Sequence, residues 1–221
     1  MNGVRIEHTL AGAIWPRRRV ARVEADASRA RDGSRFLRDA ALCAFGVALL
    51  TLSSKVSVPF LPVPMTLQTF AVLCLGAAYG VRLSAITVIA YLAAGLCGLP
   101  VFAGTPPLVA GPAYLLGPTG GFLLGFIPAA MFMGLIAEAK LDRHFSLSLP
   151  AALVSCAMIF ACGFVWLAFA ARVGTSGHGL GAALAWRKGV MPFLLGDGVK
   201  AALTAALFPA IWSAIGPRPP R

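Results

Sequence analysis

Six long apolar segments run along the chain, separated by short stretches that are polar or rich in glycine and proline. The segments are residues 36–54, 67–82, 84–103, 119–138, 149–171 and 189–214. A helix needs roughly 20 predominantly apolar residues to cross a bilayer, and the segments lie near this length. The pattern therefore predicts an all-α, polytopic membrane protein whose six-helix bundle occupies residues 36–215.

The second and third segments are separated by almost no polar sequence. Only Arg82 and Ser84 interrupt the apolar run at this point. A charged side chain is costly in the hydrocarbon core, so Arg82 is expected at the lipid–water boundary. The two segments are therefore predicted to form a tight helical hairpin.

The connection after the first segment is polar and rich in proline. Residues 55–68 read KVSVPFLPVPMTLQ and include Pro59, Pro62 and Pro64. Proline lacks an N–H donor and clashes with the preceding helical turn, so the stretch cannot continue as regular helix. Irregular backbone at the edge of a membrane protein persists where protein or an aqueous cavity covers it. The stretch is therefore predicted to be an ordered lid over a binding site.

Composition supports the membrane class. The chain is 58% hydrophobic and 12% charged, with a mean hydropathy of +0.81. Soluble domains carry about 25% charged residues. A single soluble core cannot hide this much apolar surface, so a soluble protein is excluded.

The chain has a net charge of +11, and its basic residues are concentrated near the N-terminus, since nine of the 19 lie within residues 1–38. This placement follows the positive-inside rule and predicts a flexible cytoplasmic tail over residues 1–35, not a nucleic-acid surface. Six crossings of the cytoplasmic membrane return residues 216–221 to the same side as a short tail. Three connections are then expected on the external face: the lid, the connection at 104–118 and the connection at 172–188.

Asp197 and Lys200 are the charged residues that stand inside an apolar segment near the C-terminus. Residues three apart share a helix face. A charge within a transmembrane helix costs about 2.5–3.5 kcal/mol on insertion scales and marks a functional site by default. We expect both side chains to face the bundle interior and hold a small polar ligand. The alternatives are a buried ion pair that only stabilises packing, or a pair that reaches water at the membrane interface.

Enzyme chemistry finds little support in the sequence. His8, His144 and His178 all lie outside the apolar segments, and Asp197 is the only acidic residue well inside one. The chain contains no HExxH motif, no Cys/His ligand cluster and no GxxxxGK[ST] phosphate loop. We expect neither catalysis nor a cofactor, and a single Asp–Lys pair fits ligand binding better.

Aromatic and amide side chains near the external face are candidates for enclosing the ligand. Phe60, Phe102, Tyr114 and Phe122 supply apolar surface of the kind that lines small-molecule pockets. Gln68 supplies a hydrogen-bonding group beside the lid.

Small residues suggest two sites of close approach. Gly120 and Gly121 open the fourth segment, where they serve either helix packing or contact between the backbone and a ligand. Ala40, Ala44 and Ala48 are spaced by four along the first segment, and small residues at this spacing let helices approach closely in lipid.

Five short motifs, in order, carry a resemblance to a known family. They are VPMTLQT at 63–69, GLPVF at 98–102, LGPTGGF at 116–122, GFI at 125–127 and PFxxGDxxK at 192–200. Together they resemble the BioY family, the biotin-binding S components of energy-coupling-factor (ECF) transporters, over roughly residues 36–215.

The resemblance implies six transmembrane helices and an external biotin pocket that the first loop caps. It also implies partners, namely a transmembrane coupling protein and two ATPase subunits, with Ala40, Ala44 and Ala48 as the docking face. Self-association is left open. The substrate-binding residues expected on motif and chemistry are Asp197, Lys200, Gln68, Thr66, Phe102, Tyr114, Gly120 and Gly121.

The chain departs from the family pattern in one region. Other members place an Asn or Arg near the third-to-fourth helix connection, and residues 103–118 contain neither. The partner of the biotin carboxylate therefore stays open between Lys200 and the backbone amides of Gly120 and Gly121. An S component for another small vitamin is the alternative within the same class.

Overall fold

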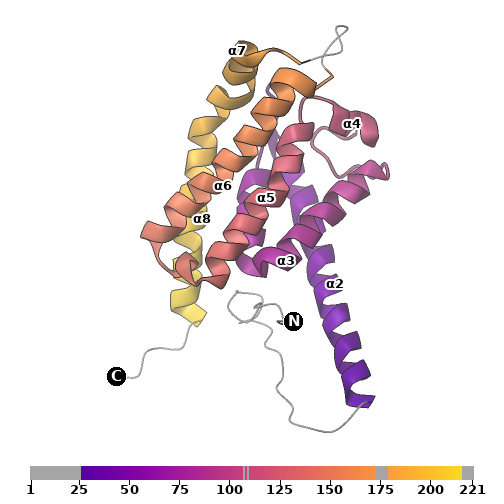
Figure 1. The fold of residues 1–221 in the computed structure, drawn as a ribbon, viewed down its shortest axis with the longest axis vertical. Coiled ribbons are helices and arrows are strands. Elements are labelled where there is room, and N and C mark those ends of the chain that lie inside the picture. Colours follow the sequence, from indigo (N-terminus) through magenta and orange to yellow (C-terminus); the bar gives the residue numbers. More distant parts are fainter. Residues whose placement is uncertain (1–25, 107, 109, 173–178, 216–221) are drawn as a thin grey trace.

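The computed structural model describes residues 26–106, 108, 110–172 and 179–215, with side chains from residue 33 onward. Helices dominate the described chain (Figure 1). The α-helices are α2 (Asp26–Lys55), α3 (Gln68–Leu96), α4 (Pro112–Leu116), α5 (Gly120–Glu138), α6 (Phe145–Val165), α7 (Ala182–Ala185) and α8 (Leu194–Ile215). Two short strands, β1 (Ser57–Val58) and β2 (Met65–Thr66), lie between α2 and α3.

Shorter helical turns complete the chain. They are the 3-10 turns η2 (Leu141–Arg143) and η6 (Met191–Phe193) and the π-helical turns η3 (Trp166–Ala170) and η5 (Trp186–Val190). The last apolar segment is therefore interrupted before Leu194, where Pro192 lies in the 3-10 turn η6, because proline cannot continue a regular helix.

Five helical stretches of the described residues are long and apolar enough to cross a membrane. They are Gly33–Lys55, Gln68–Leu96, Gly120–Glu138, Phe145–Ala170 and Ala182–Ile215. The chain is therefore a multi-pass membrane protein, as predicted. The sequence pattern predicts six segments, and the difference lies in α3, which contains nearly all of the second segment and most of the third.

The chain turns back on itself within α3. Gly80 has non-helical angles of φ 78° and ψ 178°. Gln68 Nε2 donates a hydrogen bond of 2.7 Å to the hydroxyl of Tyr91, 23 residues further on. A straight helix would separate these residues by about 35 Å, so residues 68–79 and 81–96 lie side by side. The predicted hairpin is present, and it turns at Gly80, two residues before Arg82.

Close contact between α5 and this hairpin depends on small residues. A Cβ at Gly134 would overlap the backbone of Gly80 and Val81, and a Cβ at Gly76 would overlap Ala130. The freed N–H of Val81 donates to Glu138 Oε1 at 2.9 Å. The turn is therefore buried against α5 with its backbone donor satisfied.

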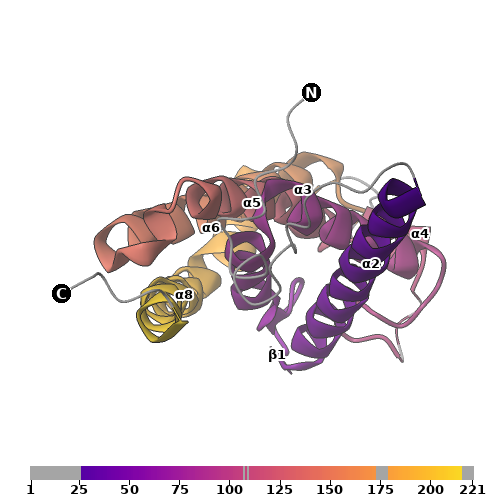
Figure 2. The ribbon, with the colours of Figure 1, turned by 90° about the horizontal axis from the view of Figure 1, so that it is seen from below.

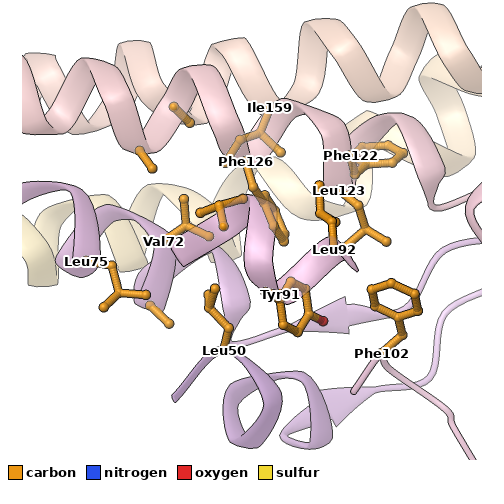
Figure 3. Packing of buried hydrophobic residues seen from close by; sticks show 14 of the residues in the cluster. Leu50, Val72, Leu75, Tyr91, Leu92, Phe102, Phe122, Leu123, Phe126 and Ile159 are labelled. Atoms are coloured by element: carbon orange, nitrogen blue, oxygen red, sulfur yellow. The ribbon is translucent and has the colours of Figure 1, made fainter. Parts of the chain in front are cut away.

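Helices α2, α3, α5 and α6 form a row in that order, and α8 is the further helix packed against it. α5 packs between α3 and α6, α2 packs on α3, and α8 packs on α6 (Figures 1 and 2). Apolar side chains from α2, α3, α5 and α6 meet in the core, among them Leu50, Tyr91, Phe126 and Ile159 (Figure 3).

The three connections predicted to share one face do lie at one end of the bundle. α4 and α7 occupy the upper end in Figure 1, and η2 lies between the opposite ends of α5 and α6. Lys55 Nζ, at the start of the lid, donates to the carbonyl oxygen of Thr105, and Arg172 N–H donates to Leu116 O at 2.9 Å. These bonds link all three connections.

The first helix begins earlier than the sequence pattern suggested. α2 starts at Asp26, within the predicted tail, because residues 26–35 are rich in Ala and Arg, which favour helix. Residues 1–25 and 216–221, the rest of the two predicted tails, lie outside the described residues.

Candidate functional site

Asp197 and Lys200 form a buried pair at the start of α8. Lys200 Nζ lies 2.7 Å from Asp197 Oδ1, and the two side chains are 12% and 6% exposed. The hydroxyl of Thr69 donates to Asp197 Oδ2 at 3.3 Å. The pair therefore faces the bundle interior, as predicted, and each charge has a partner in a medium where an unpaired charge is very costly.

Lys200 also reaches the connection after α2. Its Nζ donates to the main-chain carbonyl oxygen of Thr66 at 2.6 Å. Thr66 belongs to β2, which pairs antiparallel with β1 in the register Ser57↔Thr66 and Val58↔Met65. The ammonium therefore links α8 directly to the predicted lid.

The lid is an ordered hairpin, in agreement with the sequence-based expectation. Leu67 N–H donates to Val56 O at 3.0 Å and closes its base. The ring of Phe60 packs against Phe193, with centroids 5.9 Å apart. Met65 lies against Gly196, where any side chain would displace its sulfur. These contacts hold the lid over the start of α8.

A cavity of about 520 Å³ of atom-free space, partly open to solvent, lies beneath the lid. Its walls come from the lid, α3, α5, α6 and α8, with contributions from the α3–α5 connection. The lining residues are Val63, Pro64, Thr66, Gln68, Thr69, Ala103, Tyr114, Thr119, Phe122, Leu123, Phe126, Ile159, Phe160, Phe193, Asp197 and Lys200. Five of the eight predicted substrate-binding residues therefore meet in one cavity: Asp197, Lys200, Gln68, Thr66 and Tyr114.

Three predicted residues are not among the lining residues. Phe102 is fully buried and stacks on Tyr114 with a centroid separation of 4.8 Å, one layer behind the cavity wall. A Cβ at Gly120 would overlap the carbonyl of Leu115, and a Cβ at Gly121 would overlap the side chain of Trp166. Both glycines thus allow close packing of α5 against its neighbours, the first of the two roles considered for them.

Gln68 is held by a neighbour that the sequence did not single out. Tyr91 accepts from Gln68 Nε2 at 2.7 Å and donates to Val101 O at 3.1 Å. Since the tyrosine hydrogen is committed to Val101, the NH₂ group of Gln68 must face Tyr91. The amide oxygen of Gln68 is the atom left for the hydroxyl of Thr66, 3.4 Å away, and for a ligand.

Several lining residues were not predicted from the sequence. Some of them lie where a sequence signal was available, and others do not. Thr69, Thr119 and Phe193 lie within the motifs quoted above, so position beside Gln68, Gly120 or Asp197 was an available signal. Ile159 and Phe160 lie in the middle of a uniformly apolar segment, where nothing distinguishes a cavity-facing side chain from a lipid-facing one.

The lining chemistry suits a small molecule that is part polar and part apolar. One carboxylate, one ammonium, an amide and several hydroxyls gather near the lid, and aromatic and aliphatic side chains form the remaining walls. The lining residues include no histidine or cysteine. Within the described ranges, no group of three or more His, Cys, Asp or Glu side chains is placed to hold a metal ion.

The alanine row of the first helix lies elsewhere on the molecule. Ala40, Ala44 and Ala48 are all exposed along one side of α2. Gly46 and Leu50 point the other way, toward α3, where a Cβ on Gly46 would overlap the methyl group of Thr87. The row is therefore exposed in the described chain and accessible to lipid or to a partner.

Comparison with known proteins gives consistent relatives. A "Probable biotin transporter BioY" of Pyrococcus horikoshii is 36% identical over 165 residues, which cover 75% of this chain and 90% of that protein. "Biotin transporter BioY" of Thermotoga maritima is 38% identical over 122 residues, 55% of this chain and 69% of that protein. "Biotin transporter BioY2" of Lactococcus lactis subsp. cremoris is 33% identical over 165 residues, which cover 73% of this chain and 83% of that protein.

The fold has a solved counterpart. The crystal structure of "the S-component for biotin from an ECF-type ABC transporter" superposes with a TM-score of 0.67. It is 24% identical and the match covers 81% of this chain and 93% of that chain. The likeness at this identity establishes the fold.

The family comparison confirms the resemblance inferred from the motifs. The family sequence model described as "BioY family" matches residues 22–217, a longer stretch than the region of resemblance inferred from the motifs. The chain belongs to the BioY family.

Proposed function

We propose that the chain takes up biotin across the cytoplasmic membrane as the substrate-binding S component of an ECF transporter. One observation carries the proposal: a buried Asp197–Lys200 pair lines a cavity of suitable character beneath an ordered lid. The names of the relatives, which are biotin transporters, support the choice of ligand.

The chemistry of biotin complements the polar groups of the cavity. Its ureido ring has two N–H donors and a strong carbonyl acceptor, and its thiophane ring and valerate chain are apolar. Asp197 accepts ureido N–H groups, and Lys200 donates to the ureido oxygen. Phe126, Phe160 and Phe193 offer apolar surface for the thiophane ring.

The valerate carboxylate also needs a donor, and the alternative assignment places Lys200 on this carboxylate instead of on the ureido oxygen. Lys200 is the only cationic side chain among the lining residues. Two of its three N–H donors go to Asp197 and the Thr66 carbonyl, which leaves one for the ligand. Because Gly120 and Gly121 pack against Leu115 and Trp166, their amides are less suited to this role.

We propose that partners supply the energy for transport, since the sequence has no phosphate loop of its own. We assign these roles to a transmembrane coupling protein and two ATPase subunits, with Ala40, Ala44 and Ala48 as the docking face. In the membrane, the two arms of α3 count as separate helices, which gives six. The lid then faces outward, and both termini lie in the cytoplasm.

A purely structural role for the Asp–Lys pair is the competing proposal, together with an S component for a different vitamin. A structural pair has no need of a cavity beside it, and the cavity lined by both residues favours the binding role. Self-association of the chain is compatible with either role.

Retention of radiolabelled biotin by the purified protein in detergent tests the proposal. Asp197→Asn removes the charge that accepts the ureido donors, and affinity is expected to fall roughly tenfold to a hundredfold, the loss of one charged hydrogen bond. Asp39→Asn is the matched control, because Asp39 pairs with Arg38 on α2 and does not line the cavity.

Equal biotin retention by wild type and Asp197→Asn would remove Asp197 from the site. Retention of labelled riboflavin or thiamine in place of biotin would favour the other-vitamin alternative. A wild-type protein that binds none of the three would favour the structural role.

A further inference from the structure

Lys55, the last residue of α2, is bound by backbone carbonyl groups of a distant segment. Its Nζ donates to Pro100 O at 2.7 Å, to Phe102 O at 2.8 Å and to the carbonyl oxygen of Thr105. The hydroxyl of Thr105 lies at 3.3 Å from the same nitrogen. An ammonium group has three N–H donors, so these carbonyls use all of them.

No carboxylate accompanies this ammonium: the described residues include no ion pair with Lys55. The stem of Lys55 is exposed, whereas Phe102 and Thr105 are 0% and 2% exposed. An exposed lysine is ordinarily hydrated and mobile, so fixing it on three carbonyls costs side-chain entropy. The cost of ordering Lys55 therefore indicates that its hydrogen bonds serve to hold the segment whose carbonyl groups it binds.

That segment, residues 99–105, contributes Ala103 to one wall of the cavity and backs the same wall with Phe102. Phe102 supports the lining ring of Tyr114 from behind. The segment has no regular secondary structure, so side chains must satisfy much of its backbone. Besides Lys55, Ser54 and Tyr91 donate to Val101 O, at 2.8 and 3.1 Å, and Tyr114 donates to Ala103 O at 2.8 Å. Within the segment, the hydroxyl of Thr105 donates to Phe102 O at 2.7 Å.

We infer that Lys55 is a positioning residue for the ligand site: by binding the carbonyls of Pro100, Phe102 and Thr105, it fixes the part of the wall contributed by residues 99–105 in its ligand-holding shape. The effect on biotin rests on the function proposed above. Lys55 does not touch the cavity and acts through Ala103 and Tyr114. Loss of the ammonium loosens the wall and speeds escape of the ligand.

The test compares Lys55→Met, which keeps the length of the side chain and removes its donors, with Lys188→Met. Lys188 is an exposed lysine of η5, outside the cavity lining, with no side-chain hydrogen bond to any residue that the structure describes. The first readout is the biotin dissociation rate from the purified protein. It is expected to rise about tenfold in Lys55→Met, the effect of losing roughly one charged hydrogen bond from the bound state, and to stay unchanged in Lys188→Met.

A role in folding alone would give a different result. It would lower the number of biotin sites per mole of protein and leave the dissociation rate of the remaining sites as in wild type, which would overturn the inference. If Lys55→Met does not yield folded protein, Lys55→Gln replaces it, because the amide keeps two N–H donors and lacks the charge.

The second readout does not depend on the ligand. Amide hydrogen exchange in residues 99–106 of the biotin-free protein is expected to be faster in Lys55→Met than in wild type and Lys188→Met. Unchanged exchange there contradicts the inference even if biotin binds. A wild-type protein that fails to bind biotin contradicts the proposed function, and the exchange result still decides the role of Lys55.

Discussion

At the scale of single residues, the cavity shows how polar groups are kept in an apolar bundle. Asp197 accepts hydrogen bonds from Lys200 and Thr69. Gln68 donates to the hydroxyl of Tyr91, which in turn donates to the carbonyl oxygen of Val101. Each buried polar atom in this set has a partner from another part of the chain or from the next helical turn. Since an unpaired buried group costs about 1–3 kcal/mol, these partners also determine how the groups are oriented.

Tyr91→Phe tests the orientation of Gln68. The substitution removes one hydroxyl, leaves Gln68 Nε2 without its acceptor and frees the amide to rotate. We expect a stability loss of about 1–3 kcal/mol together with weaker biotin binding. The measurements are thermal unfolding in detergent and equilibrium biotin binding.

Tyr79→Phe is the matched control for this prediction. Tyr79 is also buried in α3, and its hydroxyl donates to Leu42 O at 2.8 Å near the Gly80 turn, away from the cavity. It should lose similar stability and keep wild-type affinity. Equal affinities in both variants would show that Tyr91 has no influence on the site.

At the scale of elements, connections and helix ends are tied by specific polar contacts. Gly80 permits the turn within α3 because its positive φ is accessible to glycine and strained for other residues. At the same end of the bundle as this turn, Asp142 of η2 accepts a hydrogen bond of 2.7 Å from Trp212 Nε1 of α8. Arg143 lies over the Trp212 ring, 4.2 Å from its centroid. This contact fastens the α5–α6 connection to the last helix.

The Asp142 contact predicts a pH dependence of stability. Burial raises the pKa of Asp142 above its usual value, although the Trp212 hydrogen bond and Arg143 partly oppose this shift. The folded state therefore holds the proton to higher pH than the unfolded state. Stability is expected to fall as pH rises from about 4, the usual carboxyl range, through the raised pKa, and to level off above it.

Thermal midpoints of wild type and Asp142→Asn across this pH range check the prediction. The asparagine keeps a carbonyl acceptor for Trp212 and does not titrate, so its midpoint should depend less on pH. The same slope in both proteins would assign the pH dependence to other groups.

At the scale of the whole molecule, the cavity and the alanine row occupy different places. The cavity lies under the lid at one end of the bundle, and Ala40, Ala44 and Ala48 lie exposed along α2. On α2, the residue that contacts the cavity wall is Lys55 at the end of the helix, seven residues beyond Ala48. Ligand binding and partner docking should therefore be separable by substitution.

Ala44→Trp tests this separation. A large side chain on the row prevents close helix approach in lipid, so biotin uptake by cells expressing the coupling protein and ATPase subunits should fall to the level without those subunits. Binding of biotin to the purified variant should remain that of wild type. Ala206→Trp, at an exposed alanine of α8, is the control and should preserve both activities. Loss of binding in Ala44→Trp would mean that the row and the cavity are not independent.

The sequence by itself determined the membrane class, the apolar segments, the hairpin near Arg82, the lid and the Asp197–Lys200 pair. These features depend on local composition, proline chemistry and helical spacing, which can be read from neighbouring residues. Five of the eight predicted site residues meet in the cavity for the same reason, since they lie within the short motifs.

Only the tertiary structure decided which side chains meet across the bundle. Phe102 stands behind Tyr114, Gly120 and Gly121 face neighbouring helices, and α2 extends beyond its apolar segment. Tyr91 meets Gln68 because Gly80 reverses the chain between them, and Lys55 meets residues 45 to 50 positions away. Such contacts depend on turn angles and on the packing of distant segments, which no local pattern encodes.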